Sequence, residues 1–154
     1  MGVPKMIRKA KIKDIKQIQE LINYFAKQDI MLPRSLNELY ENIRDFWVVE
    51  EKKKIVGCAA MHISWDDLAE VKSVAVSKKY HGKGIGRELV AACLEEAGLL
   101  GAKKVFVLTY KPEFFMKFGF KRVKHSSLPH KIWAECINCC KFPNCQETAL
   151  LKNL

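Results

Sequence analysis

The sequence predicts an α/β (or α+β) fold with a mixed, twisted sheet of about six or seven strands and helices on both faces. Segments rich in β-branched residues alternate with segments of helical periodicity. Two early strand segments are separated only by a short charged turn, which indicates an antiparallel start. A later strand leads through a glycine-rich loop into a long helix and another strand, which indicates a crossover. No linker or repeat interrupts this order, so residues 1–154 are expected to form one domain.

The first third of the chain is expected to contain one strand and two helices. Residues Ile7 to Lys11 have strand composition, and Asp14 stands at the N-cap of the first helix. The second helix begins at a capping box, in which Ser35 and Glu38 would satisfy each other's backbone donors. The apolar stripe of the first helix consists of Ile15, Ile18, Leu21, Ile22 and Phe25.

The middle of the chain is expected to contain three strands. Phe46 to Glu50 and Ile55 to Ile63 flank a turn of charged residues, 51–54, and predict an antiparallel hairpin. Two aspartates then interrupt the apolar pattern, and a strand from Ala69 to Val76 resumes it.

The C-terminal half is expected to contain one long helix, one short helix and three strands. The long helix follows the glycine-rich loop, with apolar residues at helical spacing, and ends near Gly101. The remaining elements are a strand from Val105 to Tyr110, a short helix that Pro112 opens and that runs through Lys117, a short strand after Phe118-Gly119-Phe120, and a strand from Glu147 to Leu151.

A formal net charge of +10 predicts a polyanionic partner. The basic residues are dispersed, and no zinc-finger or RNA-recognition signature occurs, so no nucleic acid is expected. A phosphorylated cofactor with an acidic substrate fits the charge instead. The apolar runs are shorter than the roughly 18 residues of a membrane span, and the start of the chain lacks the pattern of a secretory signal. We therefore expect a cytoplasmic protein without a membrane partner.

The segment from His81 to Gly86 places three glycines between a predicted strand and a predicted helix. Without side chains there, successive backbone N–H groups at the helix N-terminus are exposed and can bind a phosphate together. Lys83 and Arg87 add positive charge at the same end. One interpretation is a phosphate-binding loop, and the other is a glycine-rich turn without a ligand. The strand–loop–helix setting favours the first.

Two common phosphate-binding loops do not match this segment. A P-loop ends in Gly-Lys-Ser/Thr, and no such triplet occurs here. A dinucleotide-binding loop has an acidic residue roughly 20 residues further on, whereas Glu95 and Glu96 are too close and lie on the helix itself. Neither class of site is expected.

Three segments together resemble the successive motifs of the GNAT acetyltransferases: the strand Val71–Val76, the loop His81–Gly86 and the run 114–120. The resemblance implies a GNAT fold in which the loop binds the pyrophosphate of acetyl-CoA and the strand pairs with its pantetheine arm. A strand bulge is implied too, with a backbone N–H near Val76 that polarises the thioester carbonyl. The implied donor-binding residues are Val74, Ala75, Val76, His81, Gly82, Lys83, Gly84, Ile85, Gly86, Arg87, Phe114 and Phe115.

The chain departs from the GNAT pattern at two positions. His81 replaces the Gln or Arg that opens the family's loop, and Phe115 replaces a tyrosine that in many members protonates the leaving thiolate. Because phenylalanine has no proton to give, another group must serve as the acid, or the thiolate leaves unprotonated. The resemblance implies Thr109 as a candidate, because it matches a position at which similar GNAT enzymes can hold a hydroxyl near the reacting sulfur. Tyr110 is the nearest alternative, since a phenol is the better proton donor.

A narrower resemblance, to the GNAT domains of the N-acetylglutamate synthases that open arginine biosynthesis, covers nearly the whole chain. Four segments carry it: Pro33-Arg34-Ser35, Ala69 to Val76, Leu108-Thr109-Tyr110 with Pro112 to Phe115, and Leu128 to Trp133 with the cysteines after it. The resemblance implies L-glutamate as the acceptor, with Arg34 and the backbone near Ser73 in its site. Glutamate carries two carboxylates, so Lys72 and Lys131 are further candidates to bind it.

Glu70 is the candidate general base, as its match to the synthases implies. The amine of a free amino acid is mostly ammonium at neutral pH and must lose a proton before it attacks. Strand alternation puts Glu70 and Lys72 on one face, so an ion pair between them, or a solvated edge carboxylate, is the competing interpretation. The expected reaction is direct attack on acetyl-CoA, without an acyl-enzyme.

Four cysteines crowd near the C-terminus, where three states remain open: a zinc site, free or packed thiols, and a disulfide. No second Cys-x-x-Cys pair occurs, so a metal is not the expected cofactor. Cys58 and Cys93 lie in apolar patterns and are expected to be buried thiols. The clustered residues are Cys136, Cys139, Cys140 and Cys145.

Two other functions remain open from the sequence. One is acetyl transfer to a different small-molecule or protein amine, and the other is a basic binding or regulatory module that keeps the fold without catalysis. The intact glycine loop favours catalysis. The sequence is also compatible with a homodimer.

Overall fold

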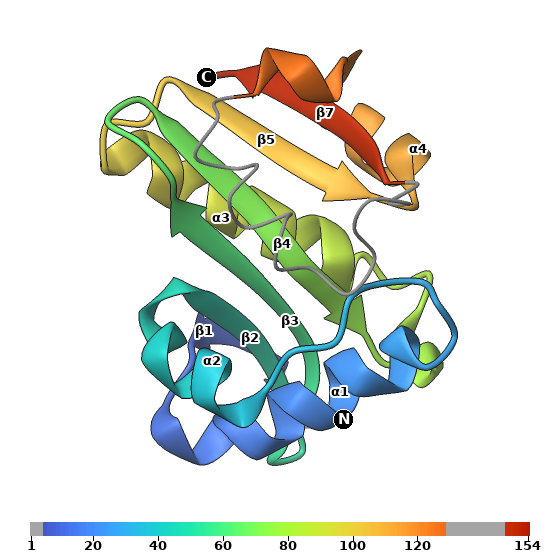
Figure 1. Cartoon of the computed structure of the whole chain (residues 1–154). Coiled ribbons are helices and arrows are strands. Elements are labelled where there is room, and N and C mark those ends of the chain that lie inside the picture. The colour runs from blue at the N-terminus through green and yellow to red at the C-terminus, as the bar shows by residue number, and fades with distance from the viewer. Residues whose placement is uncertain (1–4, 129–146) are drawn as a thin grey trace.

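The computed structural model describes residues 5–128 and 147–154, which form a seven-stranded mixed sheet with helices on both faces (Figure 1). The predicted strands and helices are present, with ends that shift by a residue or two. The strands are β1 (Met6–Lys9), β2 (Phe46–Glu51), β3 (Lys54–Ile63), β4 (Leu68–Val76), β5 (Lys104–Thr109), β6 (Lys121–Val123) and β7 (Thr148–Asn153). The helices are α1 (Ile15–Ala26), α2 (Leu36–Glu41), α3 (Ile85–Leu99) and α4 (Pro112–Met116), and the short 3-10 turns are η1 (Ile12–Asp14), η2 (Ile43–Asp45), η3 (Lys78–Tyr80) and η4 (His125–Ser127).

The strand order is β1-β2-β3-β4-β5-β7-β6. β1 to β4 form an antiparallel meander, as the charged turn after β2 predicted. β4 and β5 run parallel and are connected through α3, because a parallel pair needs a crossover. β7 inserts between β5 and β6 and is antiparallel to both. The sheet is therefore mixed, with its single parallel pair in the interior.

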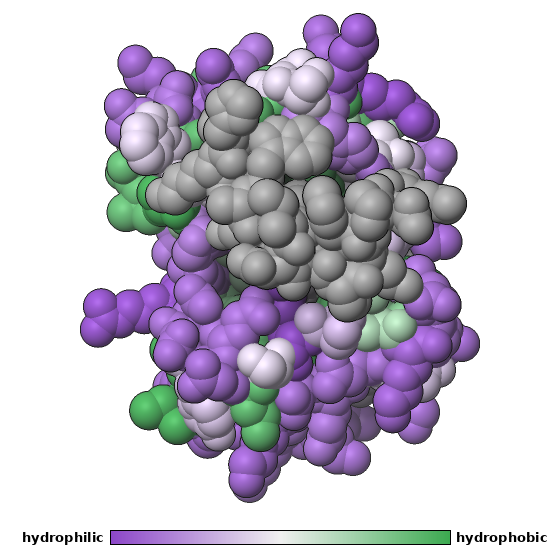
Figure 2. Space-filling view, in the orientation of Figure 1, coloured by the Kyte–Doolittle hydropathy of each residue, from purple (hydrophilic) through white to green (hydrophobic). Residues whose placement is uncertain are grey.

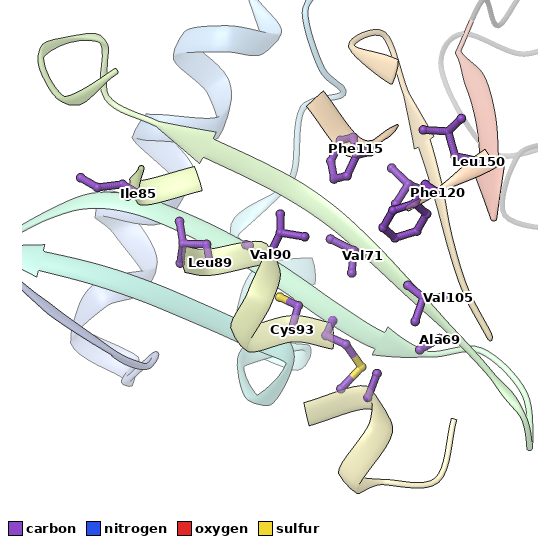
Figure 3. Close-up of a cluster of buried hydrophobic side chains, with 14 of the residues drawn as sticks. Ala69, Val71, Ile85, Leu89, Val90, Cys93, Val105, Phe115, Phe120 and Leu150 are labelled. Carbon is purple, nitrogen blue, oxygen red and sulfur yellow. The ribbon is translucent and has the colours of Figure 1, made fainter. Parts of the chain in front are cut away.

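Two apolar layers hold the helices against the sheet. α3 covers one face, where its buried Ile85, Leu89, Val90 and Cys93 share one apolar cluster with Val71 of β4 (Figure 3). α1 and α2 cover the opposite face of β2, β3 and β4 in a separate cluster of buried residues. Burying an aliphatic side chain stabilises a protein by about 1.5–3 kcal/mol, so both faces of the central strands are strongly anchored.

The two predicted helix caps behave differently. Ser35 caps α2, since its Oγ accepts the N–H of Glu38 at 3.1 Å. Asp14 precedes α1 as predicted but does not cap it with its side chain. Its carboxylate instead accepts two hydrogen bonds from the guanidinium of Arg8, at 2.7 and 3.1 Å, and one from the backbone N–H of Lys11, at 2.7 Å. A nearby cation and a turn amide thus compete successfully for the oxygen atoms that a cap would use.

Candidate active site

The central feature of the site is the separation of β4 from β5. The two strands pair only from Leu68–Lys104 to Glu70–Phe106, and beyond Glu70 no residue of β4 is paired with β5. Figure 1 shows the two arrows side by side at one end and diverging toward their tips. β5 continues alongside β7 to Thr109, so the divergence comes from β4.

A bulge at Ser73 bends β4 away. Two residues, Ser73 and Val74, face the single residue Ala59 of β3, because the pairs on either side are Ala60–Lys72 and Cys58–Ala75. Ser73 is buried and has a φ of +56°, a left-handed conformation that costs a non-glycine residue roughly 1–2 kcal/mol. This confirms the bulge that the GNAT resemblance implied.

After the bulge, one side of β4 is left unpaired by the described strands; we call this side of residues 74–76 the open edge. The N–H of Ser77 donates to Val56 of β3 at 2.9 Å. Backbone groups alternate in direction along a strand, so the N–H and C=O groups of Val74 and Val76 point away from β3. The carbonyl oxygen of Val76 accepts a hydrogen bond from Nε2 of His81 at 2.7 Å. The remaining groups of the open edge have the geometry to accept an added extended chain.

The glycine loop leads from the open edge into α3. Gly82 and Gly84 have φ of +78° and +80°, and a Cβ built on either would meet nothing within 4 Å, so the loop is open to a ligand. Gly84 is the N-cap of α3, and the first intrahelical bond runs from Glu88 N–H to Gly84 C=O. The amides of residues 85–87 therefore lack intrahelical partners and can bind an anion.

Aromatic side chains support the loop from both sides. A Cβ at Gly86 would stand 3.2 Å from the ring of Phe114, so this glycine allows the loop to approach α4 closely. Phe115 is buried in the core and packs edge-to-face against Phe114. On the other side, the ring of His81 stacks on Phe25 of α1, with 6.0 Å between centroids. His81 thus fixes the start of the loop to β4 and α1.

The cations at the loop are exposed. Lys83 and Arg87 both lie on the surface, and the Nζ atom of Lys83 is 5.2 Å from the ring centre of Tyr80. In the orientation of Figure 1, the described surface is mostly hydrophilic, with separate small apolar areas (Figure 2). The positive charges of Lys83 and Arg87 are therefore at the surface beside the loop, where a bound phosphate would neutralise them.

The predicted acceptor residues meet on the α2 side of the bulge. The Nε atom of Arg34 donates to Oγ of Ser73 at 3.3 Å, and its Nη1 atom donates to Glu38 at 3.0 Å. A small pocket here is lined by Arg34, Glu38, Asp45, Lys72 and Ser73, among others. Three of the four predicted acceptor residues are therefore together, and Lys131 lies outside the described residues.

Glu70 sits where the two strands separate, and its side chain is buried, with an exposed fraction of 7%. It lies on the same face as Lys72 by strand alternation. Among the ion pairs between described residues, none joins the two, which removes the competing interpretation of a Glu70–Lys72 pair.

Thr109 and Tyr110, the predicted proton donors, lie at the end of β5, on the other arm of the divergence. The Oγ1 atom of Thr109 accepts the N–H of Lys111 at 2.9 Å. This bond uses a lone pair of the hydroxyl and leaves its hydrogen able to donate. Both residues are half-buried.

Sequence reasoning missed one polar pair in this region. The Nδ1 atom of His62, on β3, lies 2.6 Å from Oδ2 of Asp45 in η2. His62 is the cross-strand partner of Glu70. The hairpin register, extended from the turn between Ile63 and Leu68, could have revealed that pairing, but nothing local indicates that η2 would bring Asp45 to it.

The cysteines divide into two groups. Cys58 and Cys93 are fully buried, as predicted, and burial raises the pKa of each thiol to about 12. The clustered residues Cys136, Cys139, Cys140 and Cys145 lie outside the described residues. Within residues 5–128 and 147–154, no three His, Cys, Asp or Glu side chains are placed to hold a metal. The same residues include no helix that is long and apolar enough to cross a bilayer.

Comparison with known sequences places this geometry in a family. A family model described as an acetyltransferase (GNAT) domain matches residues 42–122. An uncharacterised N-acetyltransferase from Chlorobaculum tepidum is 38% identical over 96% of this chain and 96% of its own length. An amino-acid acetyltransferase from Mycobacterium tuberculosis is 36% identical over 84% of this chain and 76% of its own length.

Two solved structures that contain bound coenzyme A have the same fold. The crystal structure of Rv2747 from Mycobacterium tuberculosis in complex with CoA has a TM-score of 0.84 at 32% identity, with 97% of this chain and 99% of that chain covered. An N-acetylglutamate synthase from Neisseria gonorrhoeae, complexed with coenzyme A and N-acetyl-glutamate, has a TM-score of 0.86 at 26% identity. All of this chain is covered, but only 36% of that one. The chain belongs to the GNAT family of N-acetyltransferases, and acetyl-CoA is the donor that its loop and open edge fit.

Proposed function

We propose that this chain, as one domain spanning residues 1–154, transfers the acetyl group of acetyl-CoA to the α-amino group of L-glutamate, the reaction that opens arginine biosynthesis. The contact of Arg34 with Ser73 carries the proposal. It holds a guanidinium at the bulge, three residues along β4 from Glu70. Guanidinium groups bind carboxylates through paired hydrogen bonds, and an acidic amino acid provides such a carboxylate beside its reactive amine. The named amino-acid acetyltransferase and synthase relatives support the same acceptor class.

The chemistry divides between the two diverging strands. Glu70 removes a proton from the acceptor's ammonium group, directly or through water, because only the neutral amine attacks. The freed electron pair forms the bond to the thioester carbon, and the N–H of Val76 binds the developing oxyanion. The carbon–sulfur bond then breaks, and Thr109 or Tyr110 gives the thiolate a proton. The nitrogen loses its second proton in the same step, and this proton restores the hydroxyl that protonated the thiolate. Cys58 and Cys93 are excluded as nucleophiles, since buried thiols with a pKa of about 12 stay protonated at neutral pH.

The direct test is release of the CoA thiol from acetyl-CoA in the presence of single amino acids. We expect release with L-glutamate and none above background with L-glutamine or L-lysine. Release with a different amino acid but not with L-glutamate would overturn L-glutamate as the acceptor and would leave acetyl-CoA as the donor. If the protein binds DNA in a salt-sensitive way and does not bind acetyl-CoA, the assignment of an enzymatic function is overturned.

Arg34→Lys tests the acceptor site itself. Lysine keeps the charge but cannot make the paired hydrogen bonds, so the KM for glutamate should rise roughly tenfold or more, at about 1.4 kcal/mol per tenfold. The KM for acetyl-CoA should not change. Arg44→Lys is the matched control, because Arg44 is exposed in η2 and does not line the pocket. Equal KM values in the two variants would remove Arg34 from the acceptor site.

A further inference from the structure

The hydrogen bond between His62 and Asp45 has so far no role in the chemistry. Its length is 2.6 Å, between Nδ1 of the imidazole and Oδ2 of the carboxylate. A carboxylate can only accept, so Nδ1 carries the hydrogen. In the neutral ring, Nε2 therefore holds the lone pair. Asp45 thus fixes both the orientation of the ring and the nitrogen that can take up a proton.

The sheet register places this imidazole beside the candidate base. His62 and Glu70 are directly opposite in the antiparallel pair of β3 and β4. Directly opposite side chains share a face, with Cβ atoms roughly 5 Å apart. Asp45, for its part, lines the pocket that contains Arg34 and Ser73. The His62–Asp45 pair therefore adjoins both the proposed base and the proposed acceptor site.

Exposure suggests what the pair does. Glu70 has an exposed fraction of only 7%, whereas the His62 side chain is 31% exposed and that of Asp45 is 21% exposed. A proton that arrives on a buried carboxylate needs a route to water before the next turnover. We propose that His62, held by Asp45, is a positioning residue that orients the Glu70 carboxylate and passes the proton from it to solvent. This proposal rests on the proposed function of Glu70.

The proton transfers balance without any further reactant. Glu70 takes one proton from the acceptor ammonium and becomes a neutral carboxylic acid. It gives that proton to Nε2 of His62, which becomes an imidazolium paired with the Asp45 carboxylate. The imidazolium releases the proton to water and returns to the neutral ring. Among the described residues, Asp45 of η2 bonds the His62 ring and Glu70 of β4 lies opposite it in the sheet. The pocket that Asp45 lines adds the charged groups of Arg34, Glu38 and Lys72.

A double-mutant cycle tests whether His62 acts through Glu70. His62→Gln alone should lower kcat roughly 10- to 100-fold, as loss of an outer hydrogen-bond partner does at other sites, and should leave both KM values within about twofold. In the Glu70→Gln background, the same change should have almost no further effect, because residues that act as a unit are not additive. Additive losses would overturn the proposal.

Chemical rescue separates proton transfer from a structural role. In His62→Ala, added imidazole should restore part of kcat, because the small molecule can fill the cavity and carry the proton. His125→Ala is the matched control, since His125 lies in η4 after β6; its kcat should be unchanged and unaffected by imidazole. Asp45→Asn, which keeps an acceptor oxygen but removes the charge, should lose less activity than Asp45→Ala. If His62→Ala keeps the Tm of the wild type but imidazole restores none of its kcat, the proposed passage of the proton through His62 is contradicted.

An NMR titration of the His62 ring needs no substrate and so separates this proposal from the acceptor assignment. Glu70→Gln removes a negative charge next to the ring, which should move the His62 titration curve toward lower pH. If the wild-type protein acetylates an amino acid other than glutamate, the acceptor assignment fails and the cycle is run with that amino acid. An unmoved titration curve in Glu70→Gln would overturn the coupling whatever the acceptor is.

Discussion

Asp14 and Glu70 are the two carboxylates that are buried in the described part of the chain, with exposed fractions of 2% and 7%, and they serve different ends. Asp14 lies between β1 and α1, where Arg8 and the N–H of Lys11 bind its oxygens. Arg8 reaches on to Glu50 at 3.5 Å. Glu70 lies in the middle of the sheet, at the last residue pair between β4 and β5. Asp14 thus closes a junction, whereas Glu70 stands at the start of an opening.

The difference shows that burial does not by itself identify a functional carboxylate. What distinguishes Glu70 is its position beside the open edge of β4, next to a backbone strained at Ser73. Buried polar groups and strained residues persist only where the surroundings compensate for them, and they cluster at functional sites. A carboxylate with such neighbours should affect turnover, while one saturated by a local cation should affect stability.

The largest expected effect is on turnover, from Glu70→Gln. Glutamine keeps the size and polarity of the side chain but cannot take the proton, so kcat should fall on the order of a hundredfold or more. The free energy of unfolding, from urea titration, should change by less than about 1 kcal/mol. Activity that matches the wild type at every point between about pH 6 and 9 would remove Glu70 from the mechanism.

Asp14→Asn should show the opposite pattern. The change leaves Arg8 without its main anionic partner at a buried position, which should cost about 2–3 kcal/mol of unfolding free energy. Its kcat should stay within about twofold of the wild type, because the junction lies outside the site. Asp66→Asn, at an exposed turn position, is the control and should be neutral in both measurements. If the fall in kcat of Asp14→Asn, expressed as a free energy, exceeds its loss of unfolding free energy, the distinction between Asp14 and Glu70 is contradicted.

The stabilisation by Asp14 should also depend on pH. Burial opposes ionisation of this carboxyl, but the hydrogen bonds from Arg8 and Lys11 outweigh it and lower its pKa in the folded protein. The stabilisation is therefore complete above the ordinary value of about 3.9 and is lost as the pH falls through the lower, folded value. Urea titrations of the wild type and Asp14→Asn should converge as the medium is acidified below that point. A constant difference would mean that charge is not the source.

Much of the fold was predictable because its signals are local. The charged turn after β2 predicted the hairpin, Ser35 predicted the start of α2, and the glycines predicted a loop between a strand and a helix. The insertion of β7 between β5 and β6 was not predictable, since it depends on pairing between distant segments. Asp14 was misread as a side-chain cap because the sequence does not show that Arg8 lies within reach.

The site was predictable where its residues follow one strand or loop. Glu70, Ser73 and Val76 are all on β4, so one motif predicts their order. Arg34 required the family resemblance, because its contact with Ser73 spans 39 positions in the chain. His62 was missed because it looks like a single polar residue in an apolar strand. Its contacts with η2 and its place opposite Glu70 exist only after the meander has folded.

The smallest expected effect separates strain from function at Ser73, the third buried polar residue. Ser73→Gly and Ser73→Ala both remove the oxygen that accepts from Arg34, so both should raise the KM for the acceptor by a similar factor. Only glycine adopts the φ of +56° without cost. The glycine variant should therefore be more stable than the alanine variant by about 1 kcal/mol, measured by urea titration. Equal stabilities would mean that the bulge relaxes in alanine, and the acceptor KM of that variant should then rise above that of the glycine variant. In that case, the left-handed conformation of residue 73 would be what keeps β4 bent away from β5.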